Sequence, residues 1–452
     1  MDLIQPKHSY ADETSQGHIY TNTSLWTVGS ILENNGVDIS LHDENLRETT
    51  SLSSNVVGIN LLGAPYIPVA IQTIQQLRQK FCNELIFILG GQVLTQKASK
   101  TGKTLGLDDN QFQSLFGKNV TNGMKPGIKN ISDGHNISLI PMYEKLSDED
   151  FQEYFTREIS FYVSQGCKFD CDFCAAVKNQ KEEYRDEGVM YADLCYIVER
   201  LQKSGKNQVS IYMSNLDVFQ SSRQLEGFAD MILQIKKNNP RFAFSLRGLA
   251  GTKSFITLDK NHPAILEKLV KAGFNNVGYG VDGMGPEIWK GIKKPQNNEK
   301  DILDAIRLSK EKYNITPELL MVFGHNGVDT EKSLRNAYEF VEAMVQNYGA
   351  VPRPHVAKSF IPGNDGRKNP DFKNEINLFI ENPTLFQSLD FTALASKLTH
   401  PERDFRNLVN YYYLEMCKLP GNTTLPIIPY EIGDSKEVLE TKKRENMGKY
   451  DR

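Results

Sequence analysis

The stretch YVSQGCKFDCDFCAAVK, residues 162–178, holds three of the chain's six cysteines within eight positions. Cys167, Cys171 and Cys174 have the spacing C-x3-C-x2-C, and an aromatic residue, Phe173, precedes the third. A structural zinc site needs four ligands, usually as two separated pairs, and no second C-x2-C exists in this chain. Three thiolates can instead hold three irons of a 4Fe–4S cluster, which normally takes four ligands. One iron then stays open for another ligand.

Short β-rich apolar runs alternate with helical periodicity from this stretch onward. Strands are predicted at 159–166, 208–214, 241–247, 275–281, 317–324 and 353–360, and helices near 188–205, 222–238, 263–273, 300–313 and 331–349. Strict alternation predicts a parallel sheet with right-handed crossovers. Six strands do not close an eight-stranded ring, so we expect an open (β/α)6 partial TIM barrel. Sites in such sheets lie at the carboxyl ends of the strands, where the cysteine loop begins.

The segment CKFDCDFC, residues 167–174, resembles the signature loop of the radical S-adenosylmethionine (SAM) superfamily. The resemblance implies that SAM binds the open iron through its amino and carboxylate groups. It also implies that an electron from the cluster cleaves the sulfonium to a 5′-deoxyadenosyl radical. The resemblance covers roughly residues 157–365. A non-catalytic zinc or iron–sulfur protein is the alternative from another class, and a fourth cysteine ligand would favour it.

The superfamily pattern also suggests ligand-binding residues at other strand ends. Beside Phe173 in the loop, they are Ser214 and Asn215 in MSNLD, Arg247 in SLRG, Asp282 in GYGVDG, and Pro362 and Gly363 in SFIPGNDG. By resemblance the first pair lies near the methionine amino group, the arginine near the carboxylate or ribose, the aspartate near the ribose, and the Pro-Gly turn near the adenine. Each of these residues also has an interpretation without a ligand. The charged residues could form surface ion pairs, which contribute little to stability, and the glycines could form ordinary turns.

The first 150 residues predict a second α/β domain. Residues 23–46 indicate a helix capped by Thr23 or Ser24 and then a strand, and residues 55–92 give strand, loop, helix and strand, ending in Gly90-Gly91. This pattern is Rossmann-like, but it lacks the G-x-G-x-x-G of dinucleotide sites. It resembles the N-terminal cobalamin-binding domain of one branch of the radical SAM superfamily, with the glycine pair facing the cofactor. His42 is a candidate cobalt ligand, although a solvated loop histidine is the simpler interpretation.

Three domains are therefore expected: 1–150, 151–365 and a mainly helical region over 366–452 with a charged tail. The helical region is predicted at 385–398 and 402–417, where Tyr411, Tyr412 and Tyr413 form either core or a wall over the substrate. Segments 95–137 and 366–420 would decide the substrate, and the sequence does not name it.

Composition narrows the class of protein. The formal net charge of −4 gives no reason to expect nucleic acid or an acidic membrane as partner. There is no apolar run long enough to cross a bilayer and no signal-like start, so the prediction is a cytoplasmic protein with reduced thiols. By resemblance, the function expected is cobalamin-dependent methylation of an unactivated carbon in a small molecule or peptide, with flavodoxin or ferredoxin as reductant. Radical rearrangement, ring contraction or oxidation without methyl transfer is the alternative.

Overall fold

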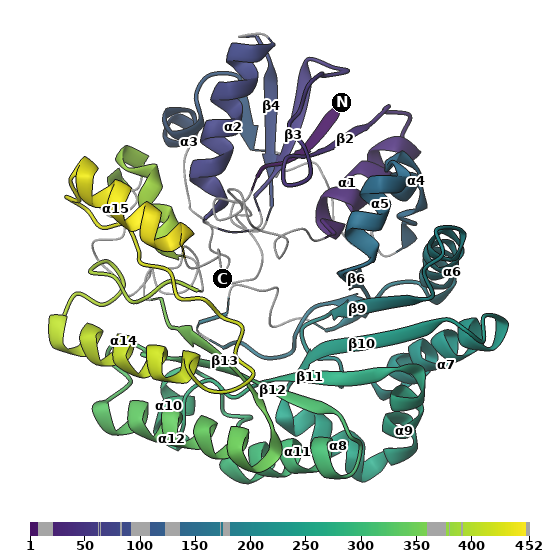
Figure 1. Cartoon of the computed structure of the whole chain (residues 1–452), viewed down its shortest axis with the longest axis vertical. Coiled ribbons are helices and arrows are strands. Elements are labelled where there is room, and N and C mark those ends of the chain that lie inside the picture. Colours follow the sequence, from purple (N-terminus) through teal and green to yellow (C-terminus); the bar gives the residue numbers. More distant parts are fainter. Residues whose placement is uncertain are drawn as a thin grey trace. The chain divides into compact units, whose positions relative to one another are not determined.

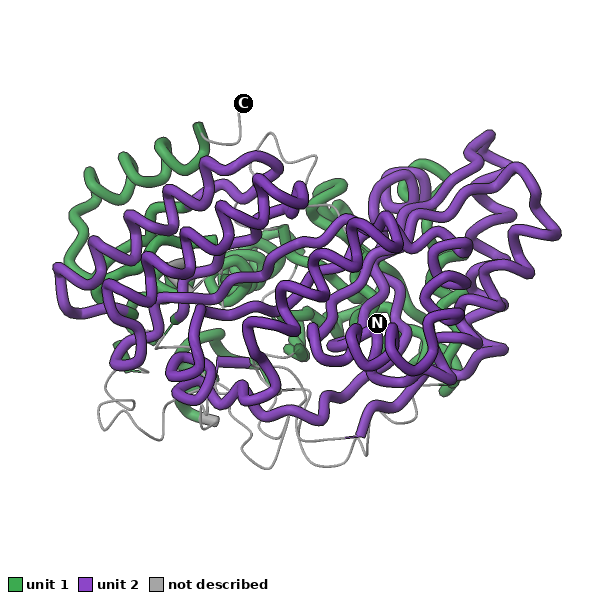
Figure 2. The backbone as a smooth tube through the Cα atoms, turned by 90° about the horizontal axis from the view of Figure 1, so that it is seen from below, with its two compact units in different colours: residues 1–150, 358–399, 427–452 green, residues 151–357, 400–426 purple. Residues whose placement is uncertain are grey.

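A computed structural model describes residues 1–7, 21–61, 63, 65–81, 84–91, 109–122, 136–171, 173–174, 181–358, 377–378, 380–389 and 392–448. The chain divides into two compact units, coloured separately in Figure 2. Unit 1 comprises residues 1–150, 358–399 and 427–452, and unit 2 comprises residues 151–357 and 400–426. The expected boundary near 150 coincides with a change of unit, whereas the expected region 366–452 is shared between both units.

Unit 1 contains a five-stranded parallel sheet in the order β2-β1-β3-β4-β5. Its strands are β1 (Asp2–Gln5), β2 (Ser40–Asp43), β3 (Val56–Asn60), β4 (Ile86–Gly90) and β5 (Val120–Asn122), and its helices include α1 (Thr23–Asn34), α2 (Tyr66–Lys80), α3 (Asp109–Phe116) and α4 (Ile140–Lys145). Figure 1 shows α2 and α3 on one side of this sheet and α1 and α4 on the other. The order reverses between β1 and β3, and ligands of doubly wound sheets bind beyond the strand ends at that point.

Two details of unit 1 differ from the sequence prediction. β1 was not predicted, yet it lies inside the sheet between β2 and β3, where Leu3 and Ile4 are buried. Helix α1 is capped by Asn22, whose Oδ1 accepts from the N–H of Leu25 at 3.1 Å, and not by Thr23 or Ser24. An amide oxygen at the N-cap satisfies one of the free N–H groups of the first turn.

Unit 2 is built on a six-stranded parallel sheet in the sequential order β13-β12-β11-β10-β9-β6. The strands are β6 (Glu158–Tyr162), β9 (Gln208–Ser214), β10 (Ala243–Ala250), β11 (Phe274–Gly280), β12 (Thr316–Phe323) and β13 (Val351–Val356). Two short strands, β7 (Ser164–Gln165) and β8 (Glu183–Tyr184), pair antiparallel beside it. Because β6 and β13 each pair with one neighbour in this sheet, the barrel is open, as predicted.

Helices connect these strands and cover the outer face of the sheet (Figure 1). They are α6 (Glu187–Lys203), α7 (Ser222–Asn238), α8 (Thr252–Asn261), α9 (Pro263–Ala272), α10 (Pro286–Gly291), α11 (Glu299–Glu311) and α12 (Glu331–Tyr348), while α5 (Asp148–Phe155) precedes β6. α8 and α10 were not predicted. Both lie in connections that follow the carboxyl ends of strands, so they contribute to the edge where the cysteine loop begins.

The C-terminal segments complete both units. The 3-10 helix η3 (Pro383–Leu389) places Leu385 and Phe386 in the core of unit 1, and α15 (Lys436–Met447) belongs to the same unit. α14 (Arg403–Cys417) packs on unit 2, and its Tyr412 and Tyr413 are buried, which confirms the core interpretation for these two tyrosines. The helix predicted over 385–398 is absent from the described residues 392–398. None of the helices in the described ranges is both long and apolar enough to span a bilayer.

Candidate cluster and cofactor site

The cysteine loop leaves the sheet of unit 2 at the carboxyl end of β6. Val163 follows this strand and donates its N–H to the carbonyl of Ser214 at the end of β9, with an N···O distance of 3.4 Å. The chain then forms β7, which pairs with β8 where the loop returns. Gly166 has a φ of 103°, and a Cβ there would lie 2.7 Å from the carbonyl oxygen of Lys181. A glycine is therefore required where the chain turns from β7 into the loop.

Cys167, Cys171 and Cys174, hereafter the cysteine triad, lie in this loop as thiols that are not joined in a disulfide. Cys171 is buried and the other two are half-buried, and the N–H of Cys174 donates to the carbonyl of Cys171 at 3.2 Å. Burial raises the pKa of Cys167 to about 11, and the neighbouring thiolates add to the effect. The thiol is therefore protonated at neutral pH, and a bound metal must displace its proton.

The number of thiols in the triad bears on which kind of metal site these residues fit. Among the described residues, no three or more His, Cys, Asp or Glu side chains converge closely enough to hold one metal ion. A single zinc ion draws each thiolate sulfur to about 2.3 Å from one point. A four-iron cluster binds its thiolates through separate irons, so they stand farther apart. Three thiolates leave one iron of a 4Fe–4S cluster open, whereas a structural zinc ion usually takes four ligands, so the donor set fits an iron–sulfur cluster better than one zinc ion.

Residues 292–297, hereafter the Lys294 turn, lie against this loop. The Nε2 of Gln296 donates to the Sγ of Cys171 at 3.6 Å. The ammonium of Lys294 lies 5.9 Å from the centre of the Phe173 ring, which also stands 5.7 Å from the ring of His325. Burial raises the pKa of Cys171, while the charge of Lys294 acts in the opposite direction. The turn therefore supplies both a donor and a positive charge beside a thiol that a cluster would hold as thiolate.

Asp282 lies in the loop after β11 with a φ of 49°, and it is buried. Its carboxylate pairs with Lys294 and also accepts from the N–H of Val322 at 3.3 Å. Both carboxylate oxygens thus have partners within the protein. These partners show that Asp282 orients the Lys294 turn. A contact between Asp282 and a ribose stays a prediction.

Several polar atoms at the carboxyl edge of the sheet are buried without a hydrogen-bond partner among the described residues. They are both amide atoms of Asn215, which follows β9, the hydroxyl of Thr252, which follows β10, and Oε1 of Gln296. A buried, unpaired amide or hydroxyl costs free energy. A polar ligand at this edge would satisfy these atoms. The predicted contact of Asn215 to a methionine amino group stays a prediction, and the carbonyl of Ser214 beside it accepts from the N–H of Val163.

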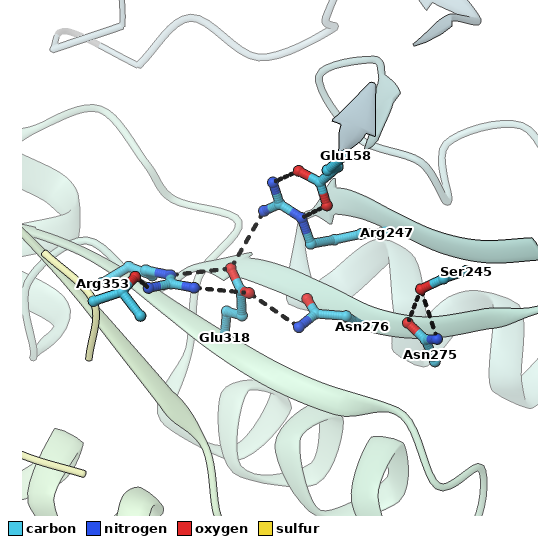
Figure 3. Close-up of polar contacts among 8 residues, drawn as sticks. Glu158, Ser245, Arg247, Asn275, Asn276, Glu318 and Arg353 are labelled. Atoms are coloured by element: carbon cyan, nitrogen blue, oxygen red, sulfur yellow. Dashed lines mark hydrogen bonds and ion pairs between the residues drawn. The ribbon is translucent and has the colours of Figure 1, made fainter. Parts of the chain in front are cut away.

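Arg247 is placed differently from the prediction (Figure 3). β10 continues to Ala250, so Arg247 lies within the strand and not at its carboxyl end. Its Nε donates to Oε2 of Glu158 at 2.8 Å, and its Nη1 donates to the buried Glu318 at 3.4 Å. Arg353 approaches the same Glu318 carboxylate at 3.3 Å. Because Glu158, Glu318 and Arg353 lie near the amino ends of their strands, Arg247 belongs to an ion-pair network away from the cysteine loop.

The remaining predicted residues fall in unit 1 or outside the described residues. Gly90 ends β4, and Gly91 has a φ of 116°, where a Cβ would lie 2.2 Å from the carbonyl oxygen of Leu61. The glycine pair thus closes the carboxyl end of β4. His42 lies in β2 and its Nε2 is 2.8 Å from Oδ1 of Asp2, so it is held within the sheet. Pro362 and Gly363 lie outside the described residues.

Two carboxyl groups beside the loop, the buried Asp217 and the half-buried Glu182, were not predicted. Asp217 accepts from the hydroxyl of Ser254 at 2.6 Å, and burial raises its pKa to about 6. Glu182 accepts from the hydroxyl of Ser164 at 2.6 Å, and burial raises its pKa to about 7. Each lies within a few residues of a strand end, which was the available sequence signal. His325 also lies two residues after a strand end, that of β12, whereas Lys294 follows α10 and has no such signal.

Comparison with known proteins identifies the family of this domain. A family model described as the radical SAM superfamily matches residues 161–337. The chain contains a radical SAM domain. The match begins near the end of β6 and ends in α12, so it includes the cysteine triad and the four barrel strands β9 to β12. The radical SAM superfamily implies a 4Fe–4S cluster and SAM, and the cysteine triad lies within the matched residues.

Similar proteins extend the likeness beyond the radical SAM domain. Two structures of the cobalamin-dependent SAM radical enzyme OxsB are similar to this chain at 12% sequence identity. The TM-score is 0.55 for the structure with aqua-cobalamin and SAM and 0.56 for the structure with aqua-cobalamin. They cover 86% of this chain and 56% of OxsB. The candidate methylthiotransferase MJ0865 of Methanocaldococcus jannaschii is 22% identical over 315 residues, which is 65% of this chain and 66% of that protein. The OxsB likeness concerns the fold, and it confirms the predicted combination of a Rossmann-like domain with a radical SAM barrel.

The chain thus spans less than two thirds of the length of both relatives. Their activities, substrates and partners belong to the whole proteins. Cobalamin binding and methyl transfer therefore enter below as proposals for this chain.

Proposed function

We propose that this radical SAM enzyme binds a 4Fe–4S cluster, SAM and cobalamin, and methylates an unactivated carbon of a small molecule or peptide. The observation that carries the proposal is the joining of the cysteine triad to a sheet of order β2-β1-β3-β4-β5 in one chain. A doubly wound sheet of that order binds cofactors beyond the strand ends where the order reverses. When bound, the cluster would supply the electron for SAM cleavage and cobalamin would supply the methyl group.

The residues of unit 2 would bind the cluster and SAM and would orient SAM beside the cluster. The cysteine triad would hold the cluster, and Phe173 would pack beside it. Asn215 and Thr252 would donate to and accept from the polar part of SAM, since their buried polar atoms have no protein partner in the described structure. Orientation of this kind places reacting atoms within reach and keeps water from a reactive intermediate.

In unit 1, the polar groups at the strand reversal support a cofactor site. Asn60 at the end of β3 donates from Nδ2 to Oδ1 of Asn22 at 2.9 Å, and Asn22 in turn pairs with Gln5 at the end of β1. This buried amide chain fixes the carboxyl ends of the two strands that flank the reversal. Gly91 keeps the neighbouring strand end free of side chain. His42 is bound to Asp2, so we propose no cobalt ligand from this residue.

The test of the proposed function is by-product stoichiometry under anaerobic conditions. Reconstituted protein should show a broad iron–sulfur absorbance and should retain about one equivalent of hydroxocobalamin through gel filtration. Turnover should yield S-adenosylhomocysteine and 5′-deoxyadenosine in equal amounts, with deuterium from the reacting carbon in the 5′-deoxyadenosine. Formation of 5′-deoxyadenosine without S-adenosylhomocysteine would favour rearrangement or oxidation. A sulfur-containing product would favour methylthio transfer, the activity named for the M. jannaschii relative.

The reductant, a flavodoxin or ferredoxin, is also a proposal, and a basic hollow supports it. The hollow has a volume of about 400 Å³ and is lined by Lys168, Phe169, Phe219, Gln220, Ser222, Lys253, Ser254, Thr257, Leu258, Asn261 and His262. Its lining contains two lysines and a histidine and no acidic residue, and Lys168 is adjacent to Cys167. A small acidic protein would find a complementary surface there, close to the cluster.

A charge reversal tests this surface. Lys253→Glu should slow reduction of the cluster by an acidic flavodoxin, most strongly at low ionic strength, and should leave reduction by dithionite unchanged. Lys260→Glu is the matched control, because Lys260 is exposed on the same helix but does not line the hollow. Equal rates for the two variants would exclude the hollow as the docking surface.

A further inference from the structure

Backbone hydrogen bonds within residues 289–297 give the Lys294 turn its shape. The N–H of Lys294 donates to the carbonyl of Trp289 at 2.7 Å, and the N–H of Asn297 donates to the carbonyl of Lys294 at 3.2 Å. Lys293 adopts a φ of 52°, a left-handed conformation that a non-glycine residue takes only when the surroundings require it. The turn is therefore held in a specific shape.

Side chains of the turn anchor it to the strand end. The ammonium of Lys294 donates to the carbonyl of Gly280 at 2.7 Å and pairs with Asp282. The Nδ2 of Asn297 donates to the carbonyls of Val281 at 2.8 Å and Gly280 at 3.1 Å. These contacts satisfy carbonyls that β11 leaves free at its carboxyl end. They also set the position of Gln296, which lies between the two anchoring residues.

Gln296 is thereby directed at the cysteine triad. Its Nε2 lies 3.6 Å from Sγ of Cys171, within the range of hydrogen bonds to sulfur. Cys171 is the buried member of the triad. Hydrogen bonds to the cysteine sulfurs of an iron–sulfur cluster, the net charge around it and its solvent exposure set its reduction potential. A donor at a thiolate stabilises the more negative, reduced cluster, and groups around the ligands tune a metal site in the same way.

We propose that Gln296 is an outer-sphere partner of the cluster that raises its reduction potential through Cys171, with Asp282, Lys294 and Asn297 as positioning residues. The inference rests on the proposed cluster. It gives Asp282 a role distinct from the ribose contact that the sequence suggested. The Oε1 of Gln296, which is buried without a partner among the described residues, is left to accept from a ligand at the same site.

The test is a potentiometric titration of the reconstituted cluster, followed by electron paramagnetic resonance, with iron and sulfide content measured for each variant. Gln296→Met keeps the length of the side chain and removes the donor, so the midpoint potential should become more negative while the cluster content stays full. Gln208→Met is the matched control, because Gln208 is exposed at the amino end of β9. Its midpoint potential should equal that of the wild type.

Asn297→Ala provides a second measurement that leaves Gln296 in place. Loss of the two anchoring bonds should loosen the turn and shift the midpoint potential in the same direction by a smaller amount. If Gln296→Met does not retain a full cluster, this variant carries the test. Unchanged midpoint potentials in both variants would overturn the inference. A wild-type protein that binds no cluster would instead overturn the proposed function, so the two failures are distinguishable.

Discussion

Removal of the ammonium from the buried Asp282–Lys294 pair should destabilise unit 2 strongly. The side chains of Lys294 and Asp282 are 9% and 5% exposed, so Lys294→Met leaves a carboxylate without its partner in a dry environment. Breaking a buried pair from one side costs about 3–5 kcal/mol. The carbonyl of Gly280 loses a donor as well, which adds roughly 1 kcal/mol.

A double-mutant cycle with Asp282→Asn isolates the pair. The Lys294→Met/Asp282→Asn protein buries no uncompensated charge, so its loss of stability should fall short of the sum of the single losses by about 2 kcal/mol. Urea unfolding can be followed by the fluorescence of Trp289, whose Nε1 donates to the carbonyl of Val281 at 3.1 Å. A Trp26→Phe background removes the other tryptophan of the chain. Additive single losses, or a loss under about 1 kcal/mol for Lys294→Met, would refute the reasoning.

Three further predictions concern other parts of the chain. Replacement of any member of the cysteine triad by alanine should abolish cluster retention and 5′-deoxyadenosine formation, whereas Cys195→Ala should retain both, as iron content and chromatography will show. Asp217 binds its proton more tightly in the folded state, because burial raises its pKa from 3.8 to about 6. Its contribution to stability is therefore complete below the unfolded pKa and is lost as the pH rises through about 6, so Asp217→Asn should gain roughly 3 kcal/mol relative to wild type over that window in denaturant titrations. Gly91→Ala should destabilise unit 1 by about 1–3 kcal/mol or more, whereas Gly90→Ala, where a Cβ meets no atom within 4 Å, should be nearly neutral. Equal melting of the two glycine variants would contradict the steric argument.

The barrel could be predicted because the same sequence pattern, a short apolar strand followed by an amphipathic helix, repeats along the chain. Each strand from β9 to β13 is a short apolar run between amphipathic helices, and the predicted ranges agree with the observed ones to within a few residues. β1 escaped prediction because four residues at the start of the chain carry too little periodicity. Its position inside the sheet follows from pairing with both β2 and β3, which is a tertiary property.

The site could be predicted only where its residues are adjacent in sequence. The spacing of the three cysteines in the sequence indicates a metal site, whereas Gln296 contacts Cys171 although the two residues are 125 positions apart in the sequence. Arg247 was misplaced because β10 continues through Gly248 and Leu249, so the strand end lies later than SLRG suggests. Its carboxylate partner Glu318 is 71 positions away. Contacts over such separations depend on sheet register, which the local pattern does not specify.

The interleaving of the two units has a consequence for biosynthesis. The chain passes between units after residues 150, 357, 399 and 426, so the first unit gains its last segment only when residues 427–452 have been made. During translation residues 151–357 of unit 2 can fold before Leu385 and Phe386 have been made. Until then the apolar surface of α2 that these two residues cover stays exposed. That surface is a target for chaperones and a hazard for aggregation in a nascent chain. Fragments cut at residue 150 would carry the same exposed surface, and expression of the N-terminal segment alone should give poorly soluble protein.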